Sequence, residues 1–269
     1  MTDEISPTMR GRRLRIELRQ LRDESGLTIE SVARQLDWSP SKVSRLETGQ
    51  RGVHPSDVRL LSQVYDIPSE RREELIEMAR QSRKRSWWHE YREEFPAWLE
   101  FYLDYEAEAT LVRMFTEERI PGPLQVEGYA REVGPGEMQQ VRRGRFAQHG
   151  IPPLHVILSE GALRRLVGGV DVMREQLTHL AKIAEVEHVT LQVLPFDAGA
   201  HPALGDPFTV LEFADHQAIT YHDHQSTGVY LEKKDETERY DRSFRELEKL
   251  ALTPERTVEF IVGLARDLV

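Results

Sequence analysis

The sequence predicts a mainly α N-terminal domain of five helices, residues 1–83, followed by an α/β (α+β) domain, residues 84–269. Apolar residues recur at helical spacing through the first region, and capping residues separate the segments. The composition changes at a short basic run, residues 83–86. Beyond residue 120, compact apolar runs typical of strands alternate with helical patterns. A chain of 269 residues is long enough for two such domains.

Composition excludes several classes of protein. No apolar run approaches the roughly 18 residues that cross a membrane, and the N-terminus lacks the apolar core of a signal peptide. We therefore expect a cytoplasmic protein. The absence of cysteine excludes disulfides, thiolate catalysis and cysteine zinc sites.

The net charge of −10 is unevenly distributed. Residues 1–85 contain 17 Lys and Arg against 14 Asp and Glu, a balance of +3, whereas residues 86–269 contain 19 against 32, a balance of −13. The basic charge therefore lies in the helical region, where it favours contact with phosphate. The acidic second domain should limit non-specific adhesion to DNA.

The first two helices are defined by apolar spacing and a cap. The first spans residues 9–25, with Leu14 and Leu18 on its inner face. The second begins after Thr28, a candidate N-cap, and stops at residues 37–38.

A third short helix follows a tight turn. Ser39 can cap it, Pro40 suits its first position, and Gly49 can end it in the left-handed conformation. Val43 and Leu46 form its inner face. Small and basic residues are left pointing outward: Ser41, Lys42, Ser44 and Arg45. Such a helix, held across a partner helix, can enter the major groove of DNA, so we expect these four residues to contact base edges and nearby phosphate.

The segment resembles the lambda-repressor-like helix-turn-helix family, also called the XRE family. The matching residues are Val32, Ala33, Trp38, Ser39, Ser41, Val43, Ser44, Glu47 and Gly49. The chain departs at Ile29, where many members have a polar phosphate-binding residue, and at Pro40, a frequent base-contacting Gln. The resemblance implies that Arg22 pairs with Glu47 as a structural, partly buried pair. It also implies phosphate contacts from the loop after the third helix.

Candidate contacts to DNA phosphate lie near the start of the first helix and in the loop after the third: Arg12, Arg13, Gln50 and Arg51. For any single arginine of the first helix, a merely solvated position is an equal alternative. His54 is interpreted as a loop residue without a role. Ser56 is expected to cap a fourth helix, and a fifth spans residues 70–83.

The second domain begins with a predicted helix, residues 87–110, dense in aromatic side chains. Interleaved acidic residues would repel phosphate, so a core or partner-binding role is favoured over stacking on nucleic acid. The candidate ligand or partner surface consists of Trp87, Trp88, Tyr91, Trp98 and, further along, His201. Strands are expected at residues 154–158, 189–194, 208–213, 218–221 and 228–232, and helices at 129–131, 170–185, 236–250 and 254–268. Thr253 is expected to cap the last helix, and the strand order stays open.

This domain resembles the C-terminal domain of the actinobacterial WhiJ-like regulators. The similarity rests on Trp87, Trp88, Tyr91, Ile120, Pro121, Gly122, Leu124, Gln125, Tyr129, Ala130, Arg131, Leu158, Glu160, Ala162, Leu163, Val167, Gly168, Gly169, Gln176, Leu177, Gln192, Val193, Leu194, Pro195, Gly199, Ala200, His201, Pro202, Pro207 and Phe208. The chain departs at Pro123 and at residues 221–223. The resemblance implies a helix-turn-helix regulator, in some cases antitoxin-like, often encoded beside a small acidic partner protein.

Motifs for chemistry are lacking in the second domain. Neither a phosphate-binding glycine loop nor a nucleophile elbow occurs there, so we expect no cofactor and no enzyme; a hydrolase is a remote alternative. His222 and His224 could ligate a metal, but a polar hairpin tip is favoured, and no metal site is expected. The loop at residues 196–202 follows a strand at an edge where α/β sheets bind ligands, although a purely structural loop is the favoured reading.

Together these observations predict a sequence-specific DNA-binding transcriptional regulator. One recognition helix reads few base pairs, so we expect a homodimer on a pseudo-palindromic operator, with recognition helices about 34 Å apart. The second domain would bind an unknown small ligand or a partner. The alternative is an antitoxin-like or adaptor protein whose main role is to bind a small protein encoded beside it.

Overall fold

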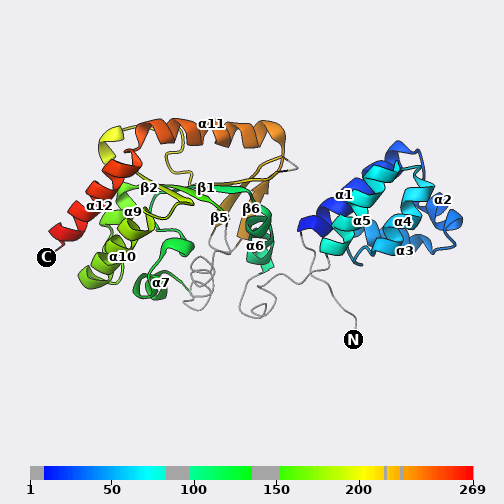
Figure 1. Ribbon diagram of the computed structural model, residues 1–269, viewed down its shortest axis with the longest axis horizontal. Coiled ribbons are helices and arrows are strands. Elements are labelled where there is room, and N and C mark those ends of the chain that lie inside the picture. Colours follow the sequence, from blue (N-terminus) through cyan, green and yellow to red (C-terminus); the bar gives the residue numbers. More distant parts are fainter. Residues whose placement is uncertain (1–8, 83–96, 135–151, 215–216, 225–226, 269) are drawn as a thin grey trace. The chain divides into compact units, whose positions relative to one another are not determined.

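The computed structural model describes residues 9–82, 97–134, 152–214, 217–224 and 227–268 (Figure 1). The chain divides into two compact units, Met1–Glu90 and Tyr91–Val269. The boundary expected between residues 83 and 84 lies outside the described residues.

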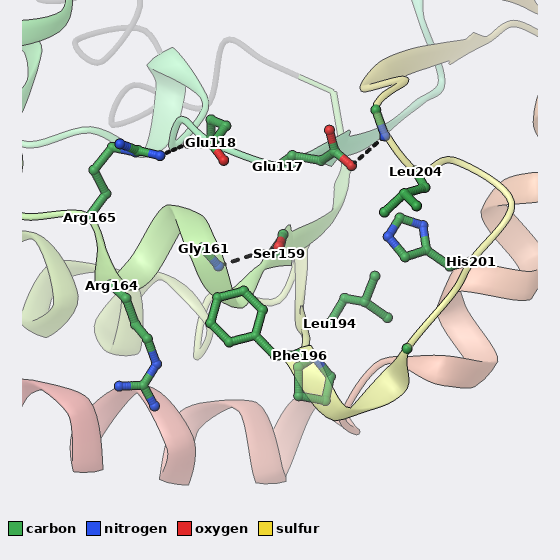
Figure 2. A pocket seen from close by; sticks show the side chains of 13 residues that line it. Glu117, Glu118, Ser159, Gly161, Arg164, Arg165, Leu194, Phe196, His201 and Leu204 are labelled. Atoms are coloured by element: carbon green, nitrogen blue, oxygen red, sulfur yellow. Dashed lines mark hydrogen bonds and ion pairs between the residues drawn. The ribbon is translucent and has the colours of Figure 1, made fainter.

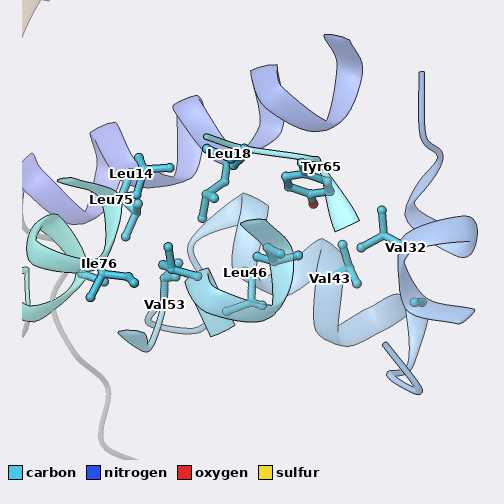
Figure 3. Packing of buried hydrophobic residues seen from close by; sticks show 14 residues of the cluster. Leu14, Leu18, Val32, Val43, Leu46, Val53, Tyr65, Leu75 and Ile76 are labelled. Atoms are coloured by element: carbon cyan, nitrogen blue, oxygen red, sulfur yellow. The ribbon is translucent and has the colours of Figure 1, made fainter. Parts of the chain in front are cut away.

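Residues 9–82 form the predicted five-helix bundle. Its helices are α1 (Met9–Glu24), α2 (Ile29–Gln35), α3 (Pro40–Thr48), α4 (Pro55–Val64) and α5 (Ser69–Gln81). Each contributes apolar side chains to one core, in which Leu14, Val32, Val43, Val58 and Leu75 are at most 1% exposed (Figure 3). The core therefore fixes the angle at which α3 crosses its neighbours.

The predicted cap of α4 is wrong. The helix begins at Pro55, one residue before Ser56, and His54 occupies the N-cap position. The backbone N–H of His54 donates to Oδ2 of Asp57 at 3.1 Å. Because proline suits the first helical position and Asp57 supplies the carboxylate, the helix starts earlier than a serine cap would place it.

The second unit combines a sheet with helices. Its elements are α6 (Ala97–Glu108), β1 (Leu111–Thr116), η2 (Gly122–Leu124), α7 (Glu127–Val133), β2 (Leu154–Ser159), α9 (Glu160–Arg164), α10 (Val170–Ile183), β3 (Val189–Leu194), η3 (Phe196–Ala198), β4 (Phe208–Glu212), β5 (Ile219–His224), β6 (Thr227–Leu231), α11 (Lys234–Leu250) and α12 (Pro254–Asp267). Thr253 caps α12 as predicted, since its Oγ1 accepts from the backbone N–H of Arg256 at 3.3 Å.

Within the described residues the sheet has six strands, in the order β3-β2-β1-β4-β5-β6. Strands β1, β2 and β3 are parallel, and β4, β5 and β6 continue the sheet in antiparallel fashion from β1. The fold class is thus confirmed as a helical N-terminal region followed by an α+β unit. The parallel strands end at Thr116, Ser159 and Leu194, so their carboxyl ends meet at one edge.

The sequence prediction missed β1, which lies in the middle of the sheet. Arg113 interrupts the apolar run of this strand, and because a charged residue is rarely buried, the segment does not look like a central strand. Arg113 is only 8% exposed. Its Nη2 lies 2.6 Å from Oδ1 of Asp241 on α11 and 2.7 Å from Oε1 of Glu212 on β4. These two carboxylates compensate the buried guanidinium charge.

Helices cover both faces of the sheet. Figure 1 shows α11 on one face and α6, α7 and α10 on the other. Successive side chains of β5 point to opposite faces of the sheet. The ring of Tyr221 packs on Tyr102 of α6 with centroids 4.6 Å apart, and the ring of His222 packs on Tyr240 of α11 with centroids 4.9 Å apart.

Candidate nucleic-acid interface

The ends of α3 are fixed as the sequence predicted. Oγ of Ser39 accepts from the backbone N–H of Lys42 at 3.2 Å, and Pro40 is the first helical residue. Gly49 ends the helix with φ of 82°, in the left-handed region that favours glycine. Val43 and Leu46 are buried, so the opposite face of this nine-residue helix points away from the core.

That opposite face presents Ser41 and Arg45. Both are exposed, and Ser44 is half-buried. The Nε of Arg45 donates to the backbone carbonyl of Ser41 at 3.2 Å, so the guanidinium lies along its own helix. A guanidinium in this position can turn outward to the acceptor pair on a guanine edge.

Lys42 does not share the fully outward position expected for it. Its Nζ lies 3.4 Å from Oδ1 of Asp57, which is buried, and 3.3 Å from the centre of the Trp38 ring. The side chain of Lys42 is 21% exposed. The ammonium group therefore joins α3 to α4 and to the turn before α3, through an ion pair and a cation–π contact.

Arg22 and Glu47 form the pair that the XRE resemblance implies. Arg22 Nε lies 2.6 Å from Oε1 of Glu47, and Nη2 lies 3.1 Å from Oε2, an arrangement with two parallel hydrogen bonds. The two side chains are 10% and 9% exposed. Arg22 also donates to the backbone carbonyl of Leu27 at 2.9 Å. The hydrogen bond with Glu47 raises the pKa of Arg22. Because Arg22 belongs to α1 and Glu47 to α3, the pair joins the end of α3 to α1.

The candidate phosphate residues lie in two places. Arg12 and Arg13 are half-buried on α1, and Gln50 and Arg51 are exposed after the end of α3. The backbone N–H of Arg51 donates to the carbonyl of Arg45 at 3.1 Å, which holds the loop against the helix.

Sequence reasoning missed Arg15. A Cβ at Gly49 would stand 2.8 Å from Cζ of Arg15, so the guanidinium lies directly against the end of α3. Burial lowers the pKa of Arg15, and the positive charge of Arg12 lowers it further. A cation at the carboxyl end of a helix is stabilised by the helix dipole. Spacing along the chain gives no signal for this contact, because it depends on a glycine with no side chain.

The structure describes only part of the candidate ligand or partner surface of the second unit. Trp87, Trp88 and Tyr91 lie outside the described residues, as does the side chain of Trp98, which belongs to α6. His201 lines a cavity at the carboxyl edge of the parallel strands (Figure 2). The described ranges contain no group of three His, Asp or Glu residues placed to hold a metal ion. No helix among them is long and apolar enough to span a membrane.

The bundle and its capped third helix define a helix-turn-helix protein. Residues 13–75 match the family model of a helix-turn-helix domain, a type of domain found in DNA-binding regulators, and residues 99–262 match the Domain of unknown function (DUF5753). The latter match covers more than half of the chain, and the chain therefore belongs to the DUF5753 family. No curated protein and no solved structure matches it.

Proposed function

We propose that the protein is a sequence-specific DNA-binding transcriptional regulator of the XRE type, without enzymatic activity or cofactor. It would act as a homodimer on a pseudo-palindromic operator, and the second unit would sense a ligand or bind a partner. The main support is the structure of α3. This helix exposes Ser41 and Arg45, and the buried pair of Arg22 and Glu47 joins its end to α1. A rigid, capped helix with an exposed arginine is suited to the major groove.

Each side chain has a proposed role. Arg45, Ser41 and Ser44 contact base edges, with Arg45 directed at guanine. Lys42 reaches DNA when its ion pair with Asp57 opens, and otherwise positions the helix. Contacts to phosphate come from Arg12 and Arg13 on α1 and from Gln50 and Arg51 after α3. We add Arg15 of α1 to this set.

The test compares DNA upstream of the protein's own gene with shuffled DNA of equal length, by fluorescence anisotropy across salt concentrations. We expect a preference of about 10³ or more for the upstream DNA. Arg45→Ala should reduce the preference for the upstream DNA by about 1–3 kcal/mol. Arg13→Ala should weaken binding to both DNAs alike and reduce the dependence of log affinity on log salt concentration by about one unit. Arg80→Ala, on α5, changes an exposed arginine paired with Glu77 and is the control. If Arg45→Ala and Arg13→Ala both bind like wild type, the proposed DNA contacts are wrong.

The second candidate function is an antitoxin-like or adaptor protein that holds a small acidic partner protein. The resemblance to WhiJ-like regulators favours it, as do four apolar residues of α12 that are half-buried on either side of the buried Ile261. These residues are Val258, Phe260, Val262 and Leu264. Co-purification of a stoichiometric small protein with the full chain, together with equal weak binding of both DNAs, would favour this candidate over the first.

A further inference from the structure

A cavity of about 740 Å³ lies where the three parallel strands end (Figure 2). Its walls come from the loop after β1, from the junction of β2 with α9, and from the loop after β3. At β1 the strand order reverses, with β2 and β3 on one side and β4 on the other. Open α/β sheets bind ligands beyond the carboxyl ends of strands at such a reversal. A volume in the range of roughly 300–1,000 Å³ suits a small molecule.

Two large apolar side chains line this cavity without being covered. Phe196 is 62% exposed and Leu204 is 70% exposed, whereas Leu194 beneath them is 3% exposed. Apolar surface of this kind, bordered by polar residues, is typical of a binding site. The apolar body of a ligand would remove both side chains from water.

Unused polar groups of opposite sign lie around the apolar wall. Oε1 of Glu117 accepts from the backbone N–H of Gly205 at 2.8 Å, and within the described residues no hydrogen bond engages its other oxygen. Arg164 uses Nε in its pair with Glu160, while in the same described part of the chain its two terminal nitrogens have no hydrogen bond. In Figure 2 the ring of Phe196 lies between Glu117 and Arg164.

The other charges of the cavity are already engaged. Glu118 pairs with Arg165, and Glu160 accepts from Arg164 and, at 2.9 Å, from the backbone N–H of Phe196. Among the described residues, Glu117 is therefore the carboxylate of the cavity without a cationic partner, and Arg164 keeps two terminal nitrogens for a ligand, which favours a ligand with both a positive and a negative group.

His201 adds a polar group to the same wall. Its ring packs edge-on against Phe115, with centroids 5.4 Å apart. Its Nδ1 is buried and has no hydrogen-bond partner in the described ranges. An unpaired buried N–H is costly, so a neutral ring would place its proton on Nε2, which can then donate to a ligand.

We propose that this cavity binds a small zwitterion with an apolar body, of the class of apolar amino acids and dipeptides. The ammonium group contacts Glu117, the carboxylate forms paired hydrogen bonds with the terminal nitrogens of Arg164, and the apolar body covers Phe196 and Leu204. This gives the sensing role of the proposed function a ligand class, and in that respect it rests on that function.

The test uses the full-length chain and three probes with one apolar body. The probes are the dipeptide leucyl-phenylalanine, its N-acetyl form without the ammonium group, and its C-terminal amide without the carboxylate. Isothermal titration calorimetry to about 10 mM covers the affinity expected of so small a ligand. We expect the dipeptide to bind about tenfold or more tightly than either derivative, since each lost charge removes a charge-assisted hydrogen bond.

Two variants assign the contacts. Glu117→Gln should lower the affinity for the dipeptide about tenfold and leave the affinity for the N-acetyl form unchanged. Arg164→Gln should lower the affinity for the dipeptide and leave the affinity for the amide unchanged. The exposed pair Glu127 and Arg131 lies outside the cavity, so Glu127→Gln and Arg131→Gln are the controls. Equal affinity for all three probes, no saturable binding, or equal losses in the controls would overturn the proposal. The titration contains no DNA, so failure to bind an operator would count against the proposed regulator and not against the cavity.

Discussion

Lys42 belongs to α3, the proposed recognition helix, yet residues of two other segments, Asp57 and Trp38, hold its ammonium group. Asp57 is 5% exposed and loses its charged partner if Lys42 is removed. We expect Lys42→Met to lower the free energy of unfolding by about 1–3 kcal/mol, because a buried carboxylate would be left without its cationic partner. Chemical denaturation followed by tryptophan fluorescence, to which Trp38 contributes, and by circular dichroism measures this change.

A double-mutant cycle provides the control for Lys42. Asp57→Asn removes the carboxylate charge. The double variant should therefore lose less free energy of unfolding than the two single variants lose in sum. Strict additivity would show that the ion pair does not stabilise the bundle.

His222 makes the stability of the second unit depend on pH. Burial lowers the pKa of His222 below its ordinary value of 6.5, and the nearby charge of Asp206 opposes this effect only in part. Below pH 6.5 the unfolded chain therefore binds more protons at this residue than the folded chain does. Its contribution to stability is complete above that pH and is lost as the pH falls toward the folded-state pKa.

The measurement is the melting temperature at about pH 7.5 and about pH 5, on either side of an ordinary histidine pKa. We expect His222→Gln to lose less stability on acidification than wild type. His224 lies on the same strand, is exposed, and its charge is the last of the causes that lower the pKa of His222, so His224→Gln should stay much closer to wild type than His222→Gln does. Equal behaviour of the two variants would refute the role of burial at His222.

At the scale of the element, the end of α3 depends on Gly49. Alanine at a positive φ costs about 1–2 kcal/mol, and at Gly49 the new Cβ would also displace the guanidinium of Arg15. We expect Gly49→Ala to destabilise the bundle by this amount and to weaken all DNA sequences alike, as measured by thermal melting and anisotropy. Gly26→Ala, at φ of +68° with open space around it, should cost similar stability but leave DNA affinity unchanged. A loss of DNA affinity in both variants would count against Arg15.

Elements differ in how far the sequence alone could predict them. The helices around Thr28, Ser39 and Thr253 were predictable because caps and apolar spacing are local signals. Strand β1 was missed because its buried Arg113 is neutralised by Asp241, 128 positions away. The cavity could not be predicted from the sequence: the loop at residues 196–202 is a candidate ligand site there, but a structural loop is the favoured interpretation. Three separate loops build the cavity, and their meeting depends on the strand order.

At the scale of the whole molecule, the proposed homodimer predicts a dependence on operator geometry. Half-sites about one helical turn, or about 34 Å, apart place both recognition helices on one face of the DNA. We expect an insertion of about 5 base pairs between half-sites to abolish the gain from the second half-site, and an insertion of about 10 to restore part of it. Sedimentation of the complexes measures the stoichiometry. Affinity that ignores both insertions would indicate that each chain binds alone.

The two outer strands of the sheet differ in what lies beside them. At β3 the backbone carbonyl of Val193 accepts from the N–H of Leu252 at 2.8 Å, and its N–H donates to Oγ1 of Thr257 at 3.0 Å. The chain thereby occupies one border of its own sheet. At β6, the opposite border, no further strand of the described chain is paired. A sheet that can be extended on one side only cannot be propagated from copy to copy, so association through its strands would end with two chains and could not continue into a fibre.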